Sequence, residues 1–240
     1  MHGEYLTLKP KNSTEMRAYV ARPTDSGNGC GIIVLQEAFG VNGHIREIAE
    51  RFASEGYLAV APELYHRTGS GVEIAYHDFG AAEPHRETLT DELLGADLAA
   101  TFMWLGAQKE IAESRIASVG FCMGGRISFL ANELLPLKAA VSFYGGGIGT
   151  LLEKAGELHG PMLMCWGGQD KHIPHEEKRA IVDTLDALGK KYVSVEFSDA
   201  GHGFFCNERE SYNEAAAKEA WPLTLAFLRA RIFPPSSHGA

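Results

Sequence analysis

The chain has 240 residues, of which 45% are hydrophobic and 22% are charged, and these fractions exclude a disordered or fibrous protein. Lysine and arginine number 22 against 31 acidic residues, and a net charge of −9 without any basic run excludes nucleic acid as a partner. The four cysteines are widely spaced and form no CxxC pair, which excludes a disulfide scaffold and a zinc ribbon. The N-terminus is not a secretory signal, and no apolar stretch approaches the roughly 20 residues of a membrane span. We therefore expect a cytoplasmic protein with no membrane partner.

Short apolar runs, most of them flanked by glycine or proline, predict six buried strands. They lack polar alternation, which indicates that both faces of each strand are covered. In chain order the runs are residues 32–35, 58–61, 116–119, 139–143, 162–166 and 193–197. Residues 16–21 are a candidate edge strand before them.

Segments with helical spacing of apolar residues lie between and after these strands. In the first segment the apolar residues recur at i, i+3, i+4 and i+7, namely Ile45, Ile48, Ala49 and Phe52. Further helices are predicted at residues 93–105, 176–188 and 212–230, the last of them interrupted by Pro222.

Alternating strands and helices of this length predict an α/β protein with a mainly parallel sheet flanked by helices on both faces. The chain contains no internal repeat and no linker, so we expect residues 1–240 to form a single domain. Residues 66–90 are the least periodic part, and we expect them to form an excursion above the sheet that shapes a site.

A G-x-C-x-G pattern lies between the strand at residues 116–119 and a helical segment at residues 126–133. It is the strand–turn–helix pattern of a nucleophile elbow, with Cys122 in place of a serine. Gly120 and Gly124 let the strand and the helix approach each other. The turn places Cys122 at a helix N-terminus, which favours a thiolate, and directs the amide of Met123 toward a forming oxyanion. We predict that Cys122 is a catalytic nucleophile; a buried structural cysteine beside a glycine-rich turn is the alternative.

Two candidate partners of this cysteine follow in the chain. Asp170 lies on a glycine-rich loop after the strand at residues 162–166, where a helix-capping or turn role is the alternative. His202 stands between two glycines after the strand at residues 193–197, which indicates an accessible imidazole. The order nucleophile, acid, histidine is the one that accompanies a nucleophile elbow, so the three side chains are expected to converge on one edge of the sheet.

With these motifs the sequence resembles the dienelactone hydrolase (carboxymethylenebutenolidase-like) family of α/β-hydrolases. The resemblance extends from about Met16 to Phe233 and is carried by four segments, residues 36–42, 120–125, 167–170 and 200–204. It implies a Cys–His–Asp triad of Cys122, His202 and Asp170, and hydrolysis of an ester or lactone through an acyl-enzyme.

The resemblance also implies roles for two residues of the loop after the strand at residues 32–35. Glu37 would be a switch that lies beside the resting thiol and swings away when substrate binds. Taken alone, without the resemblance, Glu37 is better explained as a solvated loop charge. The amide of Ala38 would be the second oxyanion donor alongside Met123.

Substrate-binding residues are less clear from the sequence. Family members hold a substrate carboxylate with arginines, one of them four residues after the catalytic histidine, where this chain has Cys206. Arg209 is a candidate replacement, and Arg67 and Arg86 are candidates in the excursion. Tyr144, after the strand at residues 139–143, is a further candidate for the wall of the site.

Cofactors and metals are not expected. The glycine-rich residues 145–149 do not fit GxGxxG, and the closely spaced His172 and His175 lack a third ligand at helical spacing. Two other classes of function remain open: a ligand-binding protein of this fold without catalysis, and a thiol redox protein using Cys122. The first would lack one triad residue, and the second would need a resolving cysteine nearby.

Overall fold

The computed structural model describes residues 3–11, 14–112 and 115–233 of the chain. Its strands form a single eight-stranded sheet in the order β1-β2-β4-β3-β5-β6-β7-β8. The strands are β1 (Glu4–Leu8), β2 (Met16–Ala21), β3 (Gly31–Leu35), β4 (Leu58–Pro62), β5 (Ile116–Phe121), β6 (Ala140–Phe143), β7 (Met162–Gly167) and β8 (Tyr192–Phe197). The pairings of β1 with β2 and of β2 with β4 are antiparallel, whereas all pairings from β4 to β8 are parallel.

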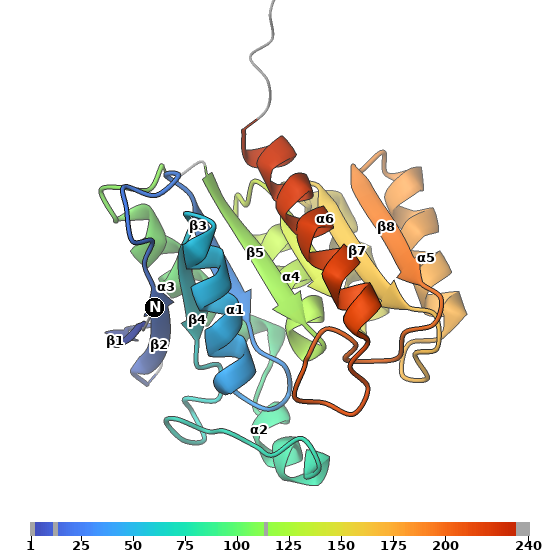
Figure 1. Ribbon diagram of the computed structural model, residues 1–240, viewed down its shortest axis with the longest axis horizontal. Coiled ribbons are helices and arrows are strands. Elements are labelled where there is room, and N and C mark those ends of the chain that lie inside the picture. Colours follow the sequence, from blue (N-terminus) through green and yellow to red (C-terminus); the bar gives the residue numbers. More distant parts are fainter. Residues whose placement is uncertain (1–2, 12–13, 113–114, 234–240) are drawn as a thin grey trace, which may run out of the picture.

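Helices cover both faces of this sheet (Figure 1). Their bounds are α1 (Gly43–Ser54), α2 (Glu83–Arg86), α3 (Asp91–Gly106), α4 (Met123–Leu134), α5 (His175–Ala187) and α6 (Glu214–Ile232), with 3₁₀ segments η1 (Phe79–Ala82) and η3 (Ile148–Glu157). In Figure 1, α1 and α6 lie in front of the sheet and α3, α4 and α5 lie behind it. Phe52 of α1 packs on Trp221 of α6 with ring centroids 4.7 Å apart, which joins the two front helices.

The core confirms the interpretation of the apolar runs. Every residue of β3, β4, β5, β6 and β7 is buried, as expected for strands covered on both faces. By contrast, β8 is partly exposed because it forms one edge of the sheet. None of the helices in the described part of the chain is long and apolar enough to cross a membrane.

Two expectations about the periphery need correction. Residues 16–21 do form a strand, but β2 is internal, because the unpredicted β1 pairs with its outer side. Most of β1 is exposed, so it carries no buried apolar run by which it could be recognised. The α6 helix is continuous across Pro222, which the sequence suggested as an interruption.

The topology determines where loops gather. The parallel strands all end at the same edge of the sheet, toward which the excursion with α2 and the loop between β8 and α6 also extend (Figure 1). In such folds ligands bind at the carboxyl ends of the strands. This edge therefore carries the residues that the sequence singled out.

Candidate active site

Cys122 occupies a strained turn between β5 and α4. Strand β5 ends at Phe121 and α4 begins at Met123, so a single residue joins them. Its φ is 53°, a left-handed value that non-glycine residues rarely adopt. The strand–turn–helix geometry predicted around Cys122 is confirmed.

The glycines on either side make this turn sterically possible. A Cβ atom on Gly120 would lie 1.8 Å from the carbonyl oxygen of Gly124. A Cβ atom on Gly124 would lie 2.3 Å from the carbonyl oxygen of Leu35, in the neighbouring strand β3. Both distances are far inside van der Waals contact, so neither position accommodates a side chain.

The loops after β7 and β8 bring Asp170 and His202 to Cys122. The Nε2 atom of His202 lies 3.1 Å from Cys122 Sγ, and its Nδ1 atom lies 2.8 Å from Asp170 Oδ2. The other carboxylate oxygen of Asp170 accepts a hydrogen bond of 2.8 Å from the amide of His172. The structure therefore aligns thiol, imidazole and carboxylate in one hydrogen-bonded row.

This row shifts the ionisation of its members. Burial by itself lowers the pKa of His202, but the hydrogen bonds to Asp170 and Cys122 outweigh it and raise the pKa to about 9. Burial raises the pKa of Asp170, yet its hydrogen bond and charge interaction with His202 bring the pKa below the usual value. The arrangement favours an imidazolium next to an ionised carboxylate at neutral pH.

A cavity of about 650 Å³ opens beside this row. Cys122 and His202 line it, and so do Ala38 and Met123. The two residues expected to supply oxyanion donors therefore share a wall with the thiol. The volume lies within the range of small-molecule sites.

Glu37 lies behind the cavity wall, fully buried, and contacts Arg209. Its Oε1 atom accepts a hydrogen bond of 2.9 Å from the Arg209 guanidinium, while its Oε2 atom has no hydrogen-bond partner. Burial raises the pKa of Glu37, and the charge and hydrogen bond of Arg209 oppose that rise. The solvated loop charge that the sequence left open is excluded, because Glu37 is 0% exposed.

Of the four candidate substrate-binding residues, two lie in the cavity wall and two do not. Arg86 and Arg209 line it. The prediction that Arg67 binds substrate is wrong. Its guanidinium makes two hydrogen bonds of 2.7 Å to the buried carboxylate of Asp97 and is not part of the cavity wall. Tyr144 is fully buried outside the lining, with its ring 5.2 Å from that of His202.

The sequence missed other residues of the wall. Arg126 lines the cavity and forms two hydrogen bonds to Asp91 at the start of α3. It stands four residues after Cys122 on α4, and i, i+4 spacing on the elbow helix is the signal that could have found it. Phe39 and Tyr76 add an aromatic surface, with ring centroids 4.7 Å apart.

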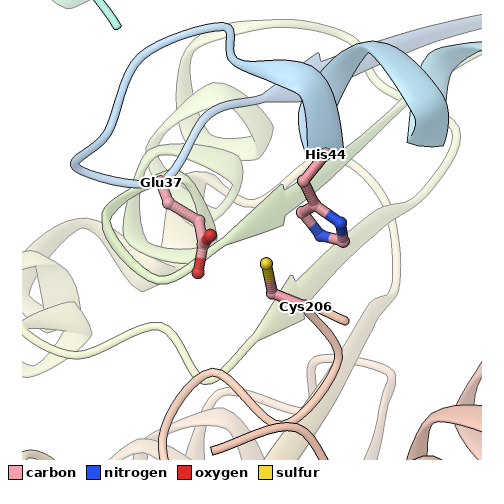
Figure 2. Close-up of side chains that lie close together, drawn as sticks. All are labelled: Glu37, His44 and Cys206. Atoms are coloured by element: carbon pink, nitrogen blue, oxygen red, sulfur yellow. The ribbon is translucent and has the colours of Figure 1, made fainter. Parts of the chain in front are cut away.

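Three further side chains of metal-ligating type lie together at this edge of the sheet. They are Glu37, His44 and Cys206, and all three are buried (Figure 2). None of them lines the cavity. No spacing in the sequence indicated this group. The four cysteines of the chain are free thiols.

A mostly parallel sheet covered by helices, with a nucleophile-type residue on a strained turn after its central strand, defines an α/β-hydrolase fold. The profile of the dienelactone hydrolase family matches residues 16–232, so the chain belongs to that family. It is accordingly a carboxylic ester hydrolase of the carboxymethylenebutenolidase type. The resemblance inferred from the sequence motifs is thereby confirmed.

Individual relatives agree with this assignment. The crystal structure of a putative dienelactone hydrolase from Klebsiella pneumoniae is 35% identical, with a TM-score of 0.85 over 94% of this chain and 97% of that one. A putative carboxymethylenebutenolidase of Synechocystis is 34% identical, over 90% of this chain and 92% of the relative. A carboxymethylenebutenolidase of a Pseudomonas species is 27% identical, over 95% and 96%.

Proposed function

We propose that the chain hydrolyses small esters or lactones with Cys122 as the nucleophile, in a single α/β-hydrolase domain. The observation that carries the proposal is the unbroken row of contacts from Cys122 Sγ through His202 to Asp170 beside a cavity. A thiol at a helix N-terminus next to an imidazolium is the setting in which cysteine nucleophiles are activated.

In the first half of the reaction, the proton of the Cys122 thiol resides on His202 Nε2, so the pair is a thiolate and an imidazolium, and the thiolate sulfur attacks the substrate carbonyl carbon. The amides of Ala38 and Met123 donate to the oxyanion that forms. Asp170 holds the imidazole by its Nδ1 atom and stabilises its positive charge. When the bond to the leaving oxygen breaks, His202 returns the proton to that oxygen, and a thioester remains on Cys122.

In the second half, a water molecule gives a proton to His202 and attacks the thioester carbonyl. The carbon–sulfur bond breaks, which restores the thiolate beside the protonated His202, and the carboxylic acid leaves. A thiolate is itself a good leaving group, so the first intermediate reverts unless the substrate oxygen departs readily. Enol esters and enol lactones meet that condition, because an enolate is a better leaving group than an alkoxide.

The cavity favours a substrate that carries a carboxylate. Arg86, Arg126 and Arg209 line it, and no aspartate or glutamate does so among the described residues. Arginine binds carboxylates through paired hydrogen bonds. In this proposal Arg209 takes the part of the family arginine whose position is occupied by Cys206.

Glu37 acts as the switch of the nucleophile. In the structure, Glu37 is paired with Arg209, and the Cys122 thiol is hydrogen-bonded to His202. A substrate carboxylate that binds Arg209 competes with Glu37 for the same guanidinium. The position of Glu37 is then coupled to the presence of an anionic substrate.

The test is a panel of aryl esters, enol esters and lactones, each with and without a carboxylate, assayed against wild type and Cys122→Ala. Cys122→Ala should lower kcat/KM by about 10⁴-fold or more, as removal of a nucleophile does in triad enzymes. Mass spectrometry of wild type quenched during turnover should find an acyl adduct on Cys122 that disappears with time.

Cys30→Ala is the matched control, because it removes a thiol that is buried at the start of β3, outside the cavity lining. It should keep the activity of wild type. Full activity of a folded Cys122→Ala variant would refute the nucleophile assignment, and equal rates for anionic and neutral substrates would refute the carboxylate preference.

A further inference from the structure

Glu37, His44 and Cys206 form a compact group of side chains with ligand-type atoms. Among residues 3–11, 14–112 and 115–233, it is the one such group of three or more, with ligand atoms that all lie within 4.8 Å of one another. Glu37 comes from the loop after β3, His44 from the first turn of α1 and Cys206 from the loop after β8. Figure 2 shows the carboxylate, the imidazole and the thiol pointing into the space between them.

Three buried polar atoms of this group, two on His44 and one on Glu37, have no hydrogen-bond partner. Neither ring nitrogen of His44 has a hydrogen bond, nor does Oε2 of Glu37. His44 is 2% exposed and the other two residues are 0% exposed. Buried polar atoms are nearly always paired, so the unpaired atoms of His44 and Glu37 indicate a missing partner.

Packing explains where the His44 ring lies, but it does not explain why a polar ring occupies this place. The ring contacts Phe121 and Phe205 edge to face, and a leucine or phenylalanine would fill this place without unpaired nitrogens. Burial and the nearby charge of Arg51 lower the pKa of His44 to about 4, while Asn207 has the opposite effect. A neutral imidazole has one ring nitrogen with a free lone pair, and this is the form of histidine that binds metals.

We propose that Glu37, His44 and Cys206 bind a divalent cation of the zinc type. Imidazole nitrogen, thiolate sulfur and carboxylate oxygen are the ligands that Zn²⁺ takes in proteins, whereas Ca²⁺ and Mg²⁺ select oxygen alone. With metal–ligand bonds of about 2.0–2.3 Å, a tetrahedral ion holds its ligands roughly 3.3–3.8 Å apart. The three atoms lie within 4.8 Å of one another, so binding requires the side chains to move closer together.

The charges around the group permit such an ion. The thiolate offsets one positive charge of the metal, and the carboxylate of Glu37 is shared between the ion and the Arg209 guanidinium. Binding displaces the proton of the Cys206 thiol into solvent, so affinity rises with pH. The Arg209 guanidinium already occupies Oε1 of Glu37, which leaves Oε2 for the ion.

An entry path leads from the substrate cavity. Tyr76 lines the cavity, and its hydroxyl lies 3.2 Å from Cys206 Sγ and 2.8 Å from Asn42 Nδ2. The thiol is thus one side chain behind the wall. A rotation of Tyr76 exposes the group, and its hydroxyl or a water molecule completes the coordination.

Whether the ion binds does not depend on the proposed function. The effect of the bound ion on turnover does depend on the proposed function. An ion on Oε2 would hold Glu37 near Arg209 and keep it from returning to Cys122. The site would then connect metal availability to the switch of the nucleophile.

Cobalt is the probe for the test, because Co²⁺ occupies zinc sites and a thiolate ligand produces a charge-transfer band in the near ultraviolet. Chelator-treated wild type is titrated with Co²⁺ and then with Zn²⁺, and binding is followed by absorbance and calorimetry. We expect one ion per chain, a thiolate band, and displacement of Co²⁺ by Zn²⁺.

Variants assign the band to a thiol. Cys206→Ala should abolish it, and His44→Gln should weaken Co²⁺ binding by at least about 100-fold while both proteins keep their circular dichroism spectra. Cys122→Ala is the matched control and should keep the band. Loss of the band in Cys122→Ala with retention in Cys206→Ala would place the ion at the triad and overturn the proposal, and so would the absence of stoichiometric binding. If Cys206→Ala does not fold, His44→Gln decides by affinity alone.

Discussion

Two groups in this chain are built from the same three kinds of side chain but differ in how these are connected. In the triad, both ring nitrogens of His202 have partners, one toward Cys122 and one toward Asp170. In the Glu37–His44–Cys206 group, neither ring nitrogen of His44 has one. Cys122 and His202 line the cavity, whereas no member of the second group does so and all three of its residues are buried.

The two histidines show what this difference does. Burial lowers the pKa of both, but His202 has an anionic partner and its pKa rises to about 9. His44 lacks such a partner and its pKa falls to about 4. Residue type and burial are therefore insufficient to assign a role. The hydrogen-bond partners raise the pKa of one imidazole, whereas the other, without an anionic partner, has a lowered pKa.

The largest effect that tests this comparison is expected from Asp170→Asn. The change removes the charge that stabilises the His202 imidazolium and should lower kcat/KM by about 10²–10⁴-fold. It should also bring the pKa of His202 below the value of about 9 in wild type. NMR titration of the His202 ring, together with steady-state kinetics, measures both quantities.

Asp170→Asn should also change how the free energy of unfolding depends on pH. The pKa of His202 is raised above its ordinary 6.5, so its pairing stabilises the fold fully below pH 6.5 and less as pH rises through about 9. The stability difference between wild type and Asp170→Asn should therefore shrink across that interval in urea unfolding. Asp199→Asn, at an exposed carboxylate of a nearby loop, is the control and should change neither rate nor pKa. An unchanged His202 pKa in Asp170→Asn would contradict the role of the pairing.

The elbow was predictable from sequence because its constraints are local. Gly120, Cys122 and Gly124 stand at fixed spacing between a strand and a helix, and the backbone contact at Gly120 is with Gly124, four residues away, although Gly124 itself approaches Leu35 of the neighbouring strand. The order of Asp170 and His202 was predictable for a related reason, since each follows directly after a parallel strand. Parallel topology then brings their loops to one edge.

What the sequence could not predict depends on partners far away in the chain. Arg67 was assigned to the cavity because its charge suited a substrate, but the buried Asp97 of α3 binds it instead. The group around His44 has no motif, because its members come from three separate segments that meet only in the fold. Such pairings follow from tertiary packing, which neither periodicity nor local spacing encodes.

A smaller effect is expected at Glu133 of α4, another buried group without partners. Neither carboxylate oxygen has a hydrogen bond, and burial, with a contribution from Glu157, raises the pKa to about 7. The native state thus holds its proton up to a higher pH than the unfolded state does, and stability falls as pH rises from about 4.5 to 7. Glu133→Gln lacks this loss and should be more stable than wild type by about 1–3 kcal/mol at pH 8.

Urea unfolding of both proteins at pH 4.5 and pH 8 measures this difference. The gain of Glu133→Gln should be small at the lower pH, where the carboxyl is protonated in the native state and about half protonated in the unfolded state. Glu153→Gln, at an exposed residue of η3, is the control and should show no such dependence. A gain of equal size at both pH values would indicate better packing instead of a titrating carboxyl.

The smallest effect is expected from His44→Leu in protein freed of metal, and it is the sharpest test of the comparison. No hydrogen bond to His44 is lost, so the free energy of unfolding should change by less than about 1 kcal/mol. His202→Leu leaves the buried carboxylate of Asp170 without its partner and should cost about 2–3 kcal/mol at pH 7. Adding Zn²⁺ should stabilise wild type but not His44→Leu, because a ligand stabilises only the state that binds it. Equal losses for the two leucine variants in chelator would mean that the His44 nitrogens are paired, and the distinction between the two groups would then fail.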